Sequence, residues 1–456
     1  MKVLLVQPTK APITIGGEDI QLYEPLALEY IASGIISEHE VRILDMRIEN
    51  SLLATLNEFK PDVVGLTSYT VNVNTVKGLS RDIKNWNPKT FIVVGGHHAT
   101  VSPDDFLIPS IDLIVRGEGV LVFKQVIERI EKGDGFDGIP GIAMRKGEGI
   151  VKTPMEPLVD FDILPFPERG LTEKYRNSYF GEWMKPLASI RTSKGCPFRC
   201  NFCAQWKINE GRYLRRSPEK IVEELGTIHE KFVFFADDES LTDYNRMKTL
   251  ARLIKEAGLK QRYFLYSRSD TVVKHPDLLE MWRSVGLERV FVGLEFFRDE
   301  DLKYISKKST IDDNKEAVRI LHDLDISIYA SFIIRPEFNR EDFKAFKRYC
   351  RELNLDFATF AVLTPLPGTD FYNEVESQLI THNYDYFDFI HTLLPTTLPL
   401  KDFYEELHNL YRQAIPATRQ LSQLRKYRLR DIPSLALTAN RVYNQVKMTY
   451  RDYNHI

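Results

Sequence analysis

Three cysteines lie close together in the middle of the chain, at Cys196, Cys200 and Cys203. Their CxxxCxxC spacing places three thiolates on one short loop, where they can converge on a metal cluster. A structural zinc site normally has four protein ligands, and the next histidine is the distant His229. A cubane iron-sulfur cluster usually takes four cysteines, so three leave one iron open to an exogenous ligand. The spacing therefore favours an open [4Fe-4S] cluster, with a zinc site completed by a distant histidine as the alternative.

The composition describes a globular chain from a reducing compartment. Its 456 residues suffice for about three domains of ~150 residues, and 43% of them are hydrophobic. Four cysteines are too few for a disulfide scaffold, and Cys350 shares helical spacing with Phe343 and Phe346, which predicts a core position. The net charge of −3 gives no reason to expect nucleic acid as a partner. With no signal peptide and no apolar run of ~18 residues, we expect a soluble, cytoplasmic protein.

The cysteine loop must be positioned by the elements of the second half of the chain, where β-branched and aromatic runs alternate with helical patterns. Six such units predict a partial (β/α)6 barrel, in which chemistry belongs at the carboxyl ends of the strands. Helices are expected at 218–231, 245–257 and 340–353. The predicted strands cover residues 187–191, 232–235, 263–266, 290–293, 328–334 and 357–362.

The first 140 residues show a separate α/β alternation, which predicts a doubly wound, Rossmann-like domain with a parallel sheet. Its strands are expected at 3–6, 41–44, 63–67, 91–94 and 111–115. Six of the 23 prolines fall between Pro140 and Pro186, which favours an extended connection. The predicted division is therefore 1–140, a proline-rich linker at 141–186, a barrel at 187–375 and a mostly helical part at 376–456.

The cysteine loop after the first barrel strand resembles that of the radical S-adenosylmethionine enzymes. The resemblance covers the second half of the chain and implies that the three cysteines bind a [4Fe-4S] cluster. It also implies that the open iron chelates the amino and carboxylate groups of S-adenosylmethionine. Reduction of that complex releases a 5′-deoxyadenosyl radical in the family, so no catalytic side chain beyond the cofactors is expected.

The same resemblance implies further contacts to S-adenosylmethionine. Phe202 matches the position beside the adenine, and Asp237 with Asp238 follows the second strand, where the family binds the methionyl amino group. The alternative for this acidic pair is that it caps the following helix. Ser267, Arg268 and Glu295 follow the third and fourth strands and resemble positions near the carboxylate and ribose, although the charged ones could instead form salt bridges at the rim.

The amino-terminal domain resembles the cobalamin-binding domain of one branch of that family. Small residues, hydroxyls and a few larger side chains follow three of its strands, and no GxGxxG motif favours a dinucleotide. In the usual cobalamin motif a histidine ligates cobalt, but the corresponding stretch here, 45–50, has Arg47 at that place. Cobalamin is therefore expected without a protein histidine on cobalt; the alternative is a scaffold that binds nothing. The expected cobalamin contacts are Thr67, Ser68, Tyr69, Gly95, Gly96, His97, Gly117 and Glu118.

Together the two resemblances imply a C-methyltransferase that moves methyl from methylcobalamin to an unactivated carbon. Segments 23–29, 235–238, 292–295 and 394–400 resemble the hopanoid methylases that modify ring A, which implies a lipid substrate. Three alternatives remain open. They are methylation of a peptide or protein side chain, a cobalamin-dependent radical cyclase or rearrangement enzyme, and a cobalamin or redox sensor.

The carboxyl-terminal tail is basic. From Arg412 to Ile456 it has nine Lys and Arg residues against Asp431 and Asp452. This charge is compatible with peripheral contact to an anionic membrane through the tail, while a solvated helical face explains it nearly as well. Besides the substrate, the resemblance implies a flavodoxin- or ferredoxin-type reductant as partner.

Overall fold

The computed structural model describes residues 1–147, 149–155 and 161–455. The chain forms two compact units. Unit 1 contains residues 1–14, 24–178 and 383–387, and unit 2 contains residues 15–23, 179–382 and 388–456. Each unit therefore takes one short segment from a distant part of the sequence. The four-part division of the chain stays a prediction. Residues 148 and 156–160 of its second part and residue 456 of its last part lie outside the described residues.

Unit 1 is built on a seven-stranded sheet in the order β3-β1-β4-β5-β6-β7-β8. The first five strands are parallel, and β7 and β8 are added antiparallel at one edge. Short β-branched runs such as Val63–Thr67 form these strands because both faces of the sheet are covered, so the central positions of the strands are apolar. The strands are β1 (Lys2–Gln7), β3 (Glu40–Asp45), β4 (Val63–Thr67), β5 (Phe91–Gly95), β6 (Leu113–Val115), β7 (Ile142–Lys146) and β8 (Gly149–Lys152).

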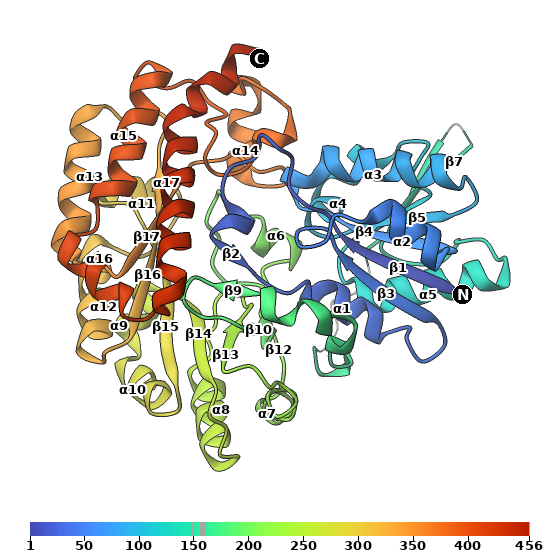
Figure 1. The fold of residues 1–456 in the computed structure, drawn as a ribbon, viewed down its shortest axis with the longest axis horizontal. Coiled ribbons are helices and arrows are strands. Elements are labelled where there is room, and N and C mark those ends of the chain that lie inside the picture. The colour runs from blue at the N-terminus through green and yellow to red at the C-terminus, as the bar shows by residue number, and fades with distance from the viewer. Residues whose placement is uncertain (148, 156–160, 456) are drawn as a thin grey trace. The chain divides into compact units, whose positions relative to one another are not determined.

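Helices cover both faces of this sheet (Figure 1). Alternate residues of each strand point to opposite faces, so Val3 packs with α1 (Leu26–Ser33) and α5 (Gly119–Lys132), while Leu4 packs with α2 (Leu52–Phe59) and α3 (Val73–Trp86). The predicted doubly wound α/β domain is confirmed.

The predicted extended connection at 141–186 is wrong in its first part. Residues 142–146 and 149–152 form the hairpin β7–β8, in which Ile142 and Ala143 are buried and most of the remaining residues are exposed. The prolines lie outside these two strands, so the hairpin needs no proline within a ladder. A ten-residue 3-10 helix, η5 (Arg169–Ser178), follows later in the region.

Unit 2 contains a six-stranded sheet in the order β10-β13-β14-β15-β16-β17, parallel throughout. Chain order and sheet order agree, as expected for a partial barrel with one helical crossover per strand. The strands are β10 (Leu187–Ile190), β13 (Phe232–Phe235), β14 (Arg262–Arg268), β15 (Leu287–Glu295), β16 (Ser327–Ile334) and β17 (Phe357–Val362). All six predicted barrel strands are confirmed.

The two faces of this sheet differ in composition. Outward residues such as Val233 and Leu265 pack under the surrounding helices in one large core. Many inward residues are aromatic, with Phe234, Phe264 and Tyr329 in a second cluster, and the buried Arg289 lies over the Phe264 and Tyr329 rings. The main covering helices are α7 (Pro218–Leu225), α8 (Tyr244–Glu256), α10 (Pro276–Ser284), α12 (Ile311–Asp323) and α13 (Arg340–Leu353). The helix expected at 218–231 ends early because the chain turns at Gly226, a poor helix former.

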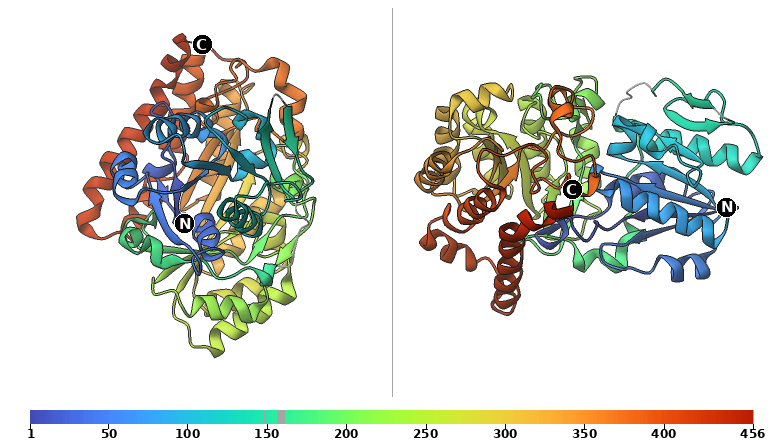
Figure 2. Two further views of the ribbon diagram at one scale, coloured as in Figure 1. Left: turned by 90° about the vertical axis from the view of Figure 1, so that its right-hand side faces the viewer. Right: turned by 90° about the horizontal axis from the view of Figure 1, so that it is seen from above.

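The carboxyl-terminal part of unit 2 carries α14 (Asp370–Val375), α15 (Leu400–Gln413), α16 (Ala417–Leu424), η8 (Leu429–Asp431) and α17 (Ile432–Met448). Figure 2 shows α16 and α17, in red, along the outside of the unit. Residues 388–399 before α15 contain no helix, whereas most of the described residues from α15 onward are helical. Among the described residues, none of the helices combines the length and the apolar character needed to cross a bilayer.

Candidate functional site

The cysteine loop leaves the barrel through a short hairpin. β11 (Ser193–Lys194) pairs antiparallel with β12 (Leu214–Arg215). Gly195 follows with φ of +86°, and a Cβ there would lie 2.2 Å from the carbonyl oxygen of Arg212. Only glycine fits this backbone, because another residue would clash with main-chain atoms. The course of the loop is thus fixed directly before Cys196.

Asp237 and Asp238 hold this loop by its backbone. The carboxylate of Asp237 accepts hydrogen bonds from the backbone N–H groups of Thr192 and Ser193, both at 2.8 Å, and from the Thr192 hydroxyl at 2.6 Å. Asp238 accepts one from the Gly195 N–H at 2.7 Å. Burial raises the pKa of Asp237, and these donors together with Arg246 oppose the shift.

The alternative that this acidic pair caps the following helix is wrong. The cap of α8 is Asp243, whose side chain accepts a hydrogen bond from the Arg246 N–H. Contact of Asp237 and Asp238 with S-adenosylmethionine stays a prediction, and the structure gives both carboxylates a second task, support of the cysteine loop.

The three loop cysteines are free thiols. Burial raises the pKa of Cys196 to about 11 and that of Cys203 to about 12, and it raises the pKa of Cys200 as well. Thiols in such surroundings become thiolates when metal ions replace their protons. A [4Fe-4S] cluster spreads its cysteines over several irons, one thiolate on each, and three thiols on one short loop suit that arrangement. The donor set therefore fits an iron-sulfur cluster.

Arg268, at the end of β14, contacts the cysteine loop twice. Its guanidinium lies 3.8 Å from the centre of the Phe198 ring, and its Nη1 lies 3.9 Å from Cys200 Sγ. Asp270 pairs with the same guanidinium at 2.8 Å and is a partner that the sequence did not indicate. Arg268 thus brings a positive charge next to the cysteine loop, where it favours the thiolate form of Cys200 over the thiol.

Two further carboxylates lie at the carboxyl ends of the barrel strands. Glu239 accepts hydrogen bonds from Ser267 Oγ at 3.2 Å and from Thr242, and burial raises its pKa. Glu295 has φ of +60° and pairs with Lys307, whose Nζ also donates to the Gly293 carbonyl at 2.6 Å. The rim salt bridge considered for Glu295 is therefore present.

Sequence reasoning missed the pairing roles of Glu239 and Lys307. Glu239 directly follows Asp237 and Asp238 after the second barrel strand, and this position could have indicated it from the sequence. Lys307 follows α11 (Asp299–Tyr304), and no local pattern indicates that it returns to the end of β15. Phe202 packs against the outer core, next to Asn201, whose backbone N–H and side chain bond to the carbonyls of Ile305 and Tyr304.

In unit 1 the loops after β4 and β5 approach each other through their backbones. The Ser68 N–H donates to the Gly95 carbonyl at 2.9 Å, and the His98 N–H donates to the Ser68 carbonyl at 3.0 Å. Gly96 has φ of +100°, and a Cβ there would lie 2.7 Å from Thr67 Oγ1 and 2.9 Å from the Ser68 nitrogen. The predicted contacts on these two loops are thus neighbours, and glycine is required where the loops meet.

An aromatic pair stands at the same edge of the unit 1 sheet. Tyr69 is 59% exposed, and its ring stacks with that of His97 at 6.2 Å and 30°. The adjacent His98 is fully buried between Thr70 and Asp105, at 3.1 Å and 2.9 Å from its two ring nitrogens. The two histidines therefore differ in kind: His98 is a core residue, and His97 belongs to the partly exposed edge.

The loop after β6 completes this edge. Gly117 has φ of +81°. Its backbone N–H donates a hydrogen bond to Thr100 Oγ1, in the segment after β5, at 3.0 Å. Glu118 caps α5 by accepting from the Val120 N–H. At the carboxyl end of β3, Arg47 forms a two-pronged ion pair with the buried Asp45, at 2.8 Å and 2.6 Å. Small residues and exposed rings fit a large, flat cofactor at this edge, and Arg47 is held by Asp45.

Comparisons with known proteins agree with both units. Residues 190–350 match the model of the radical SAM superfamily, and residues 14–127 match that of the B12 binding domain. The chain is 32% identical over 414 residues to the hopanoid C-3 methylase of Methylococcus capsulatus, covering 89% of this chain and 79% of that protein.

Two other relatives extend the comparison. The chain is 28% identical to the anaerobic magnesium-protoporphyrin IX monomethyl ester cyclase of Rubrivivax gelatinosus, over 80% of this chain and 68% of that protein. In fold it is similar to the cobalamin-dependent S-adenosylmethionine radical enzyme OxsB, with a TM-score of 0.70 and 18% identity. That match covers 89% of this chain and 65% of the OxsB chain.

Proposed function

This chain belongs to the cobalamin-dependent radical S-adenosylmethionine enzymes, and from that premise we propose that it methylates an unactivated carbon of a hopanoid-type lipid. The observation that carries the substrate class is the 32% identity to a hopanoid C-3 methylase along 89% of the chain. The family implies a [4Fe-4S] cluster, S-adenosylmethionine and cobalamin as cofactors, and an external reductant. A flavodoxin or ferredoxin is the reductant we propose.

When bound, these cofactors supply an electron, a carbon radical that abstracts hydrogen, and the methyl group. The protein holds them in place. Cys196, Cys200 and Cys203 hold the cluster, while Asp237 and Asp238 fix the backbone that carries them.

For S-adenosylmethionine we propose a polar rim around the cysteine loop. Glu239, held by Ser267, and Glu295, held by Lys307, offer carboxylates to an ammonium and to ribose hydroxyls. Arg268 offers a positive charge next to Cys200, and this charge would attract the carboxylate of S-adenosylmethionine. Phe202 is proposed to pack beside the adenine.

In unit 1 we propose that cobalamin lies on the edge formed by the three loops, with Tyr69 and His97 packed against it. No protein histidine is proposed on cobalt. Support comes from Arg47, which occupies the place of the usual histidine and is turned onto Asp45. An arginine is always charged and has no lone pair to offer a metal.

The interior of the barrel supports an apolar substrate. The ring centres of Tyr266 and Phe291 lie 4.5 Å apart, and both side chains are partly exposed. Tyr23, from the amino-terminal segment of unit 2, stacks on Phe234 at 4.6 Å and 20°. Aromatic faces of this kind give broad apolar contact to a fused ring system without requiring polar groups on it.

A radical cyclase is the second candidate, favoured by the 28% identity to a protoporphyrin ester cyclase. Anaerobic reconstitution with cobalamin, S-adenosylmethionine and a reduced flavodoxin, followed by mass spectrometry, separates the two. Methyl transfer yields both 5′-deoxyadenosine and S-adenosylhomocysteine, whereas deoxyadenosine alone would favour the cyclase. Absence of both products would favour a sensor.

The substrate is tested in cells. A strain lacking the gene should contain a lipid whose mass is lower by one methylene, and its proteins should be unchanged. A loss of methylation on a peptide or protein with an unchanged lipid profile would contradict the lipid proposal.

A further inference from the structure

The segment from α16 to the first half of α17 exposes leucines that the core does not use. Leu421 in α16 is 65% exposed, Leu429 in η8 is 86% exposed and Leu437 in α17 is 72% exposed. Neither α16 nor η8 contains a fully buried residue. An exposed leucine is ordinary by itself, but three on consecutive elements indicate a surface that meets something apolar.

The orientation of α17 explains why Leu437 is exposed. The helix buries Val442 and Val446, four residues apart, on the face toward unit 2. Leu437 lies on the opposite face, with Pro433 one turn before it and Arg441 one turn after it, both exposed. The outer face of the helix is therefore apolar at its beginning, where η8 joins it, and further along carries Arg441, which pairs with Asp19 at 2.7 Å.

Positive charge surrounds these leucines. Between Arg412 and Arg441 the chain has seven Lys and Arg residues and one acidic residue, Asp431. Some are paired, as Arg419 is with Asp356 at 2.8 Å. Arg425 and Arg428 are exposed, and neither has a carboxylate partner in the part of the chain that the structure describes. Such a surface disfavours a second copy of itself, because two copies would bring these arginines together.

From this arrangement we propose that the segment 417–441 is a docking surface for an anionic lipid bilayer. Leucines enter the boundary between headgroups and acyl chains, and the arginines meet the phosphates. This inference deepens the proposed function. It depends on that function in one respect, that the substrate resides in a membrane. It identifies the leucines as the inserted residues, which the charge of the tail alone does not.

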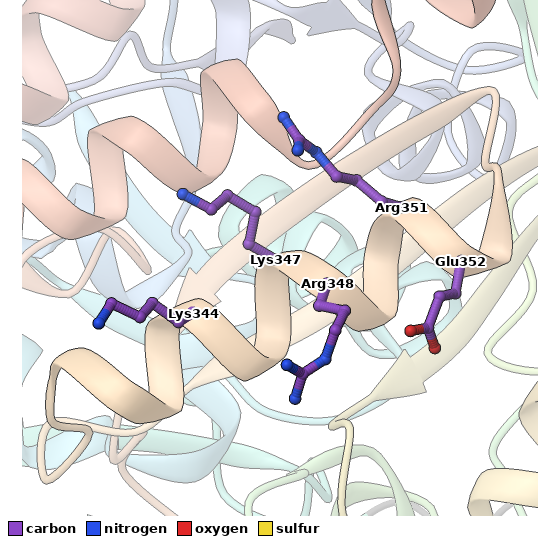
Figure 3. A pocket seen from close by; sticks show the side chains of 5 residues that line it. All are labelled: Lys344, Lys347, Arg348, Arg351 and Glu352. Atoms are coloured by element: carbon purple, nitrogen blue, oxygen red, sulfur yellow. The ribbon is translucent and has the colours of Figure 1, made fainter.

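A second basic surface of unit 2 offers a matched control. Lys344, Lys347, Arg348 and Arg351 line an open depression on α13 together with Glu352, and they project from a helix with no exposed leucine (Figure 3). If charge alone decided membrane contact, this surface would contribute as much as the segment 417–441.

The test is sedimentation of the purified full-length protein with vesicles of phosphatidylglycerol and phosphatidylcholine, and with vesicles of phosphatidylcholine alone. We expect binding to the anionic vesicles that weakens with salt. Replacement of Arg425, Arg428 and Arg430 by Gln should weaken it roughly 100-fold, at about a factor of five for each charge. The variant L421S/L429S/L437S should weaken it at least roughly tenfold.

Two controls keep the proposal falsifiable. The variant K344Q/K347Q/R348Q on α13, and L53S/I150S/I163S at exposed apolar sites of unit 1, should bind as the unaltered chain does. Equal losses in these controls, or full binding by the leucine variant, would overturn the proposal. So would size-exclusion chromatography showing a dimer that only the leucine variant dissociates, together with no vesicle binding.

Separate measurements of vesicle binding and of methyl transfer distinguish a failure of the docking surface from a failure of the proposed function. A chain that binds vesicles but forms no methylated lipid retains the docking surface and loses the proposed function. A chain that methylates a detergent-dispersed lipid but ignores vesicles retains the function and loses the docking surface.

Discussion

The carboxyl ends of the strands are lined by different kinds of residue in the two units. In unit 2 they carry buried charges, among them Asp237, Arg268 and Glu295, each satisfied by a specific partner. In unit 1 the loops after β4, β5 and β6 consist mainly of glycines, hydroxyls and the exposed ring of Tyr69, joined mainly by backbone hydrogen bonds, and a buried ion pair, Asp45 with Arg47, lies at the end of β3. Both edges follow parallel strands, so the difference does not come from the fold.

The difference indicates how each edge recognises its ligand. Buried charges with fixed partners suit a small, charged ligand, because their geometry is set before binding. Glycines and rings suit a large, flat one, which gains mostly from contact area and needs a close approach to the backbone. The two edges should therefore respond to different substitutions: unit 2 to the loss of a ligand or charge, and unit 1 to the addition of a methyl group.

The largest effect is expected from C200A in unit 2. It removes one of three cluster ligands, so we expect loss of the cluster and of all deoxyadenosine formation. Iron content and the visible absorption of the reconstituted protein measure this. The matched control is C350A, which alters a cysteine buried in α13 and should keep its iron. Equal iron in both variants would remove the cluster from this loop.

The next effect is expected from G96A in unit 1. The added Cβ would lie 2.7 Å from Thr67 Oγ1, in a backbone conformation that alanine disfavours. We expect cobalamin affinity to fall at least roughly tenfold, together with a loss of about 2 kcal/mol in stability. Absorbance titration with cobalamin and thermal unfolding measure the two quantities.

The control for G96A is G78A, within α3. Nothing lies within 4 Å of the position of a Cβ there, so alanine should stabilise the helix by up to about 1 kcal/mol and leave cobalamin binding unchanged. If G96A bound cobalamin normally, the close contact of the two loops would not serve the cofactor.

A third, smaller effect concerns a buried acidic pair away from this glycine edge. Glu29 in α1 is fully buried and accepts a hydrogen bond from Thr172 at 2.5 Å. Burial, and then the nearby Glu24, raise the pKa of Glu29 to about 8, although Arg169 and Arg176 oppose the shift. Because the folded state holds this proton and the unfolded state has lost it above about pH 4.5, stability falls as pH rises from 4.5 to 8.

The variant E29Q tests that dependence. Glutamine imitates the protonated acid, so the variant should lose the pH dependence and exceed the parent chain in stability above pH 8. We expect a difference of about 2 kcal/mol between pH 6 and pH 8, measured by urea unfolding at the two values. Parallel pH profiles for both chains would mean that Glu29 is ionised throughout.

The sequence predicted the elements better than the contacts between them. Strands such as 63–67 are recognisable because their apolar residues are continuous and β-branched, and the cysteine spacing is local. The hairpin β7–β8 was missed since its exposed Arg145 and Lys146 give it no buried pattern. The pairing of Lys307 with Glu295 depends on how α11 returns to the barrel, and no local pattern encodes such a return.

The smallest effect is expected from D238N, which asks whether charge is needed to hold the cysteine loop. Asparagine keeps an oxygen for the Gly195 N–H, 2.7 Å away in the parent chain, but loses the charge that strengthens this bond. The loss should be about 1 kcal/mol, or roughly a fivefold weaker affinity for S-adenosylmethionine with the iron content unchanged.

The measurement is the change in the electron paramagnetic resonance signal of the reduced cluster on titration with S-adenosylmethionine, which a general loss of stability would not shift. Its control is D243N at the cap of α8, which should lower stability and leave the titration unaltered. If D238N titrated as the parent chain does, the hairpin and Gly195 alone would hold the loop. The unit 2 site would then depend on backbone geometry just as the unit 1 edge does, and the contrast between them would be confined to the residues that face the ligand.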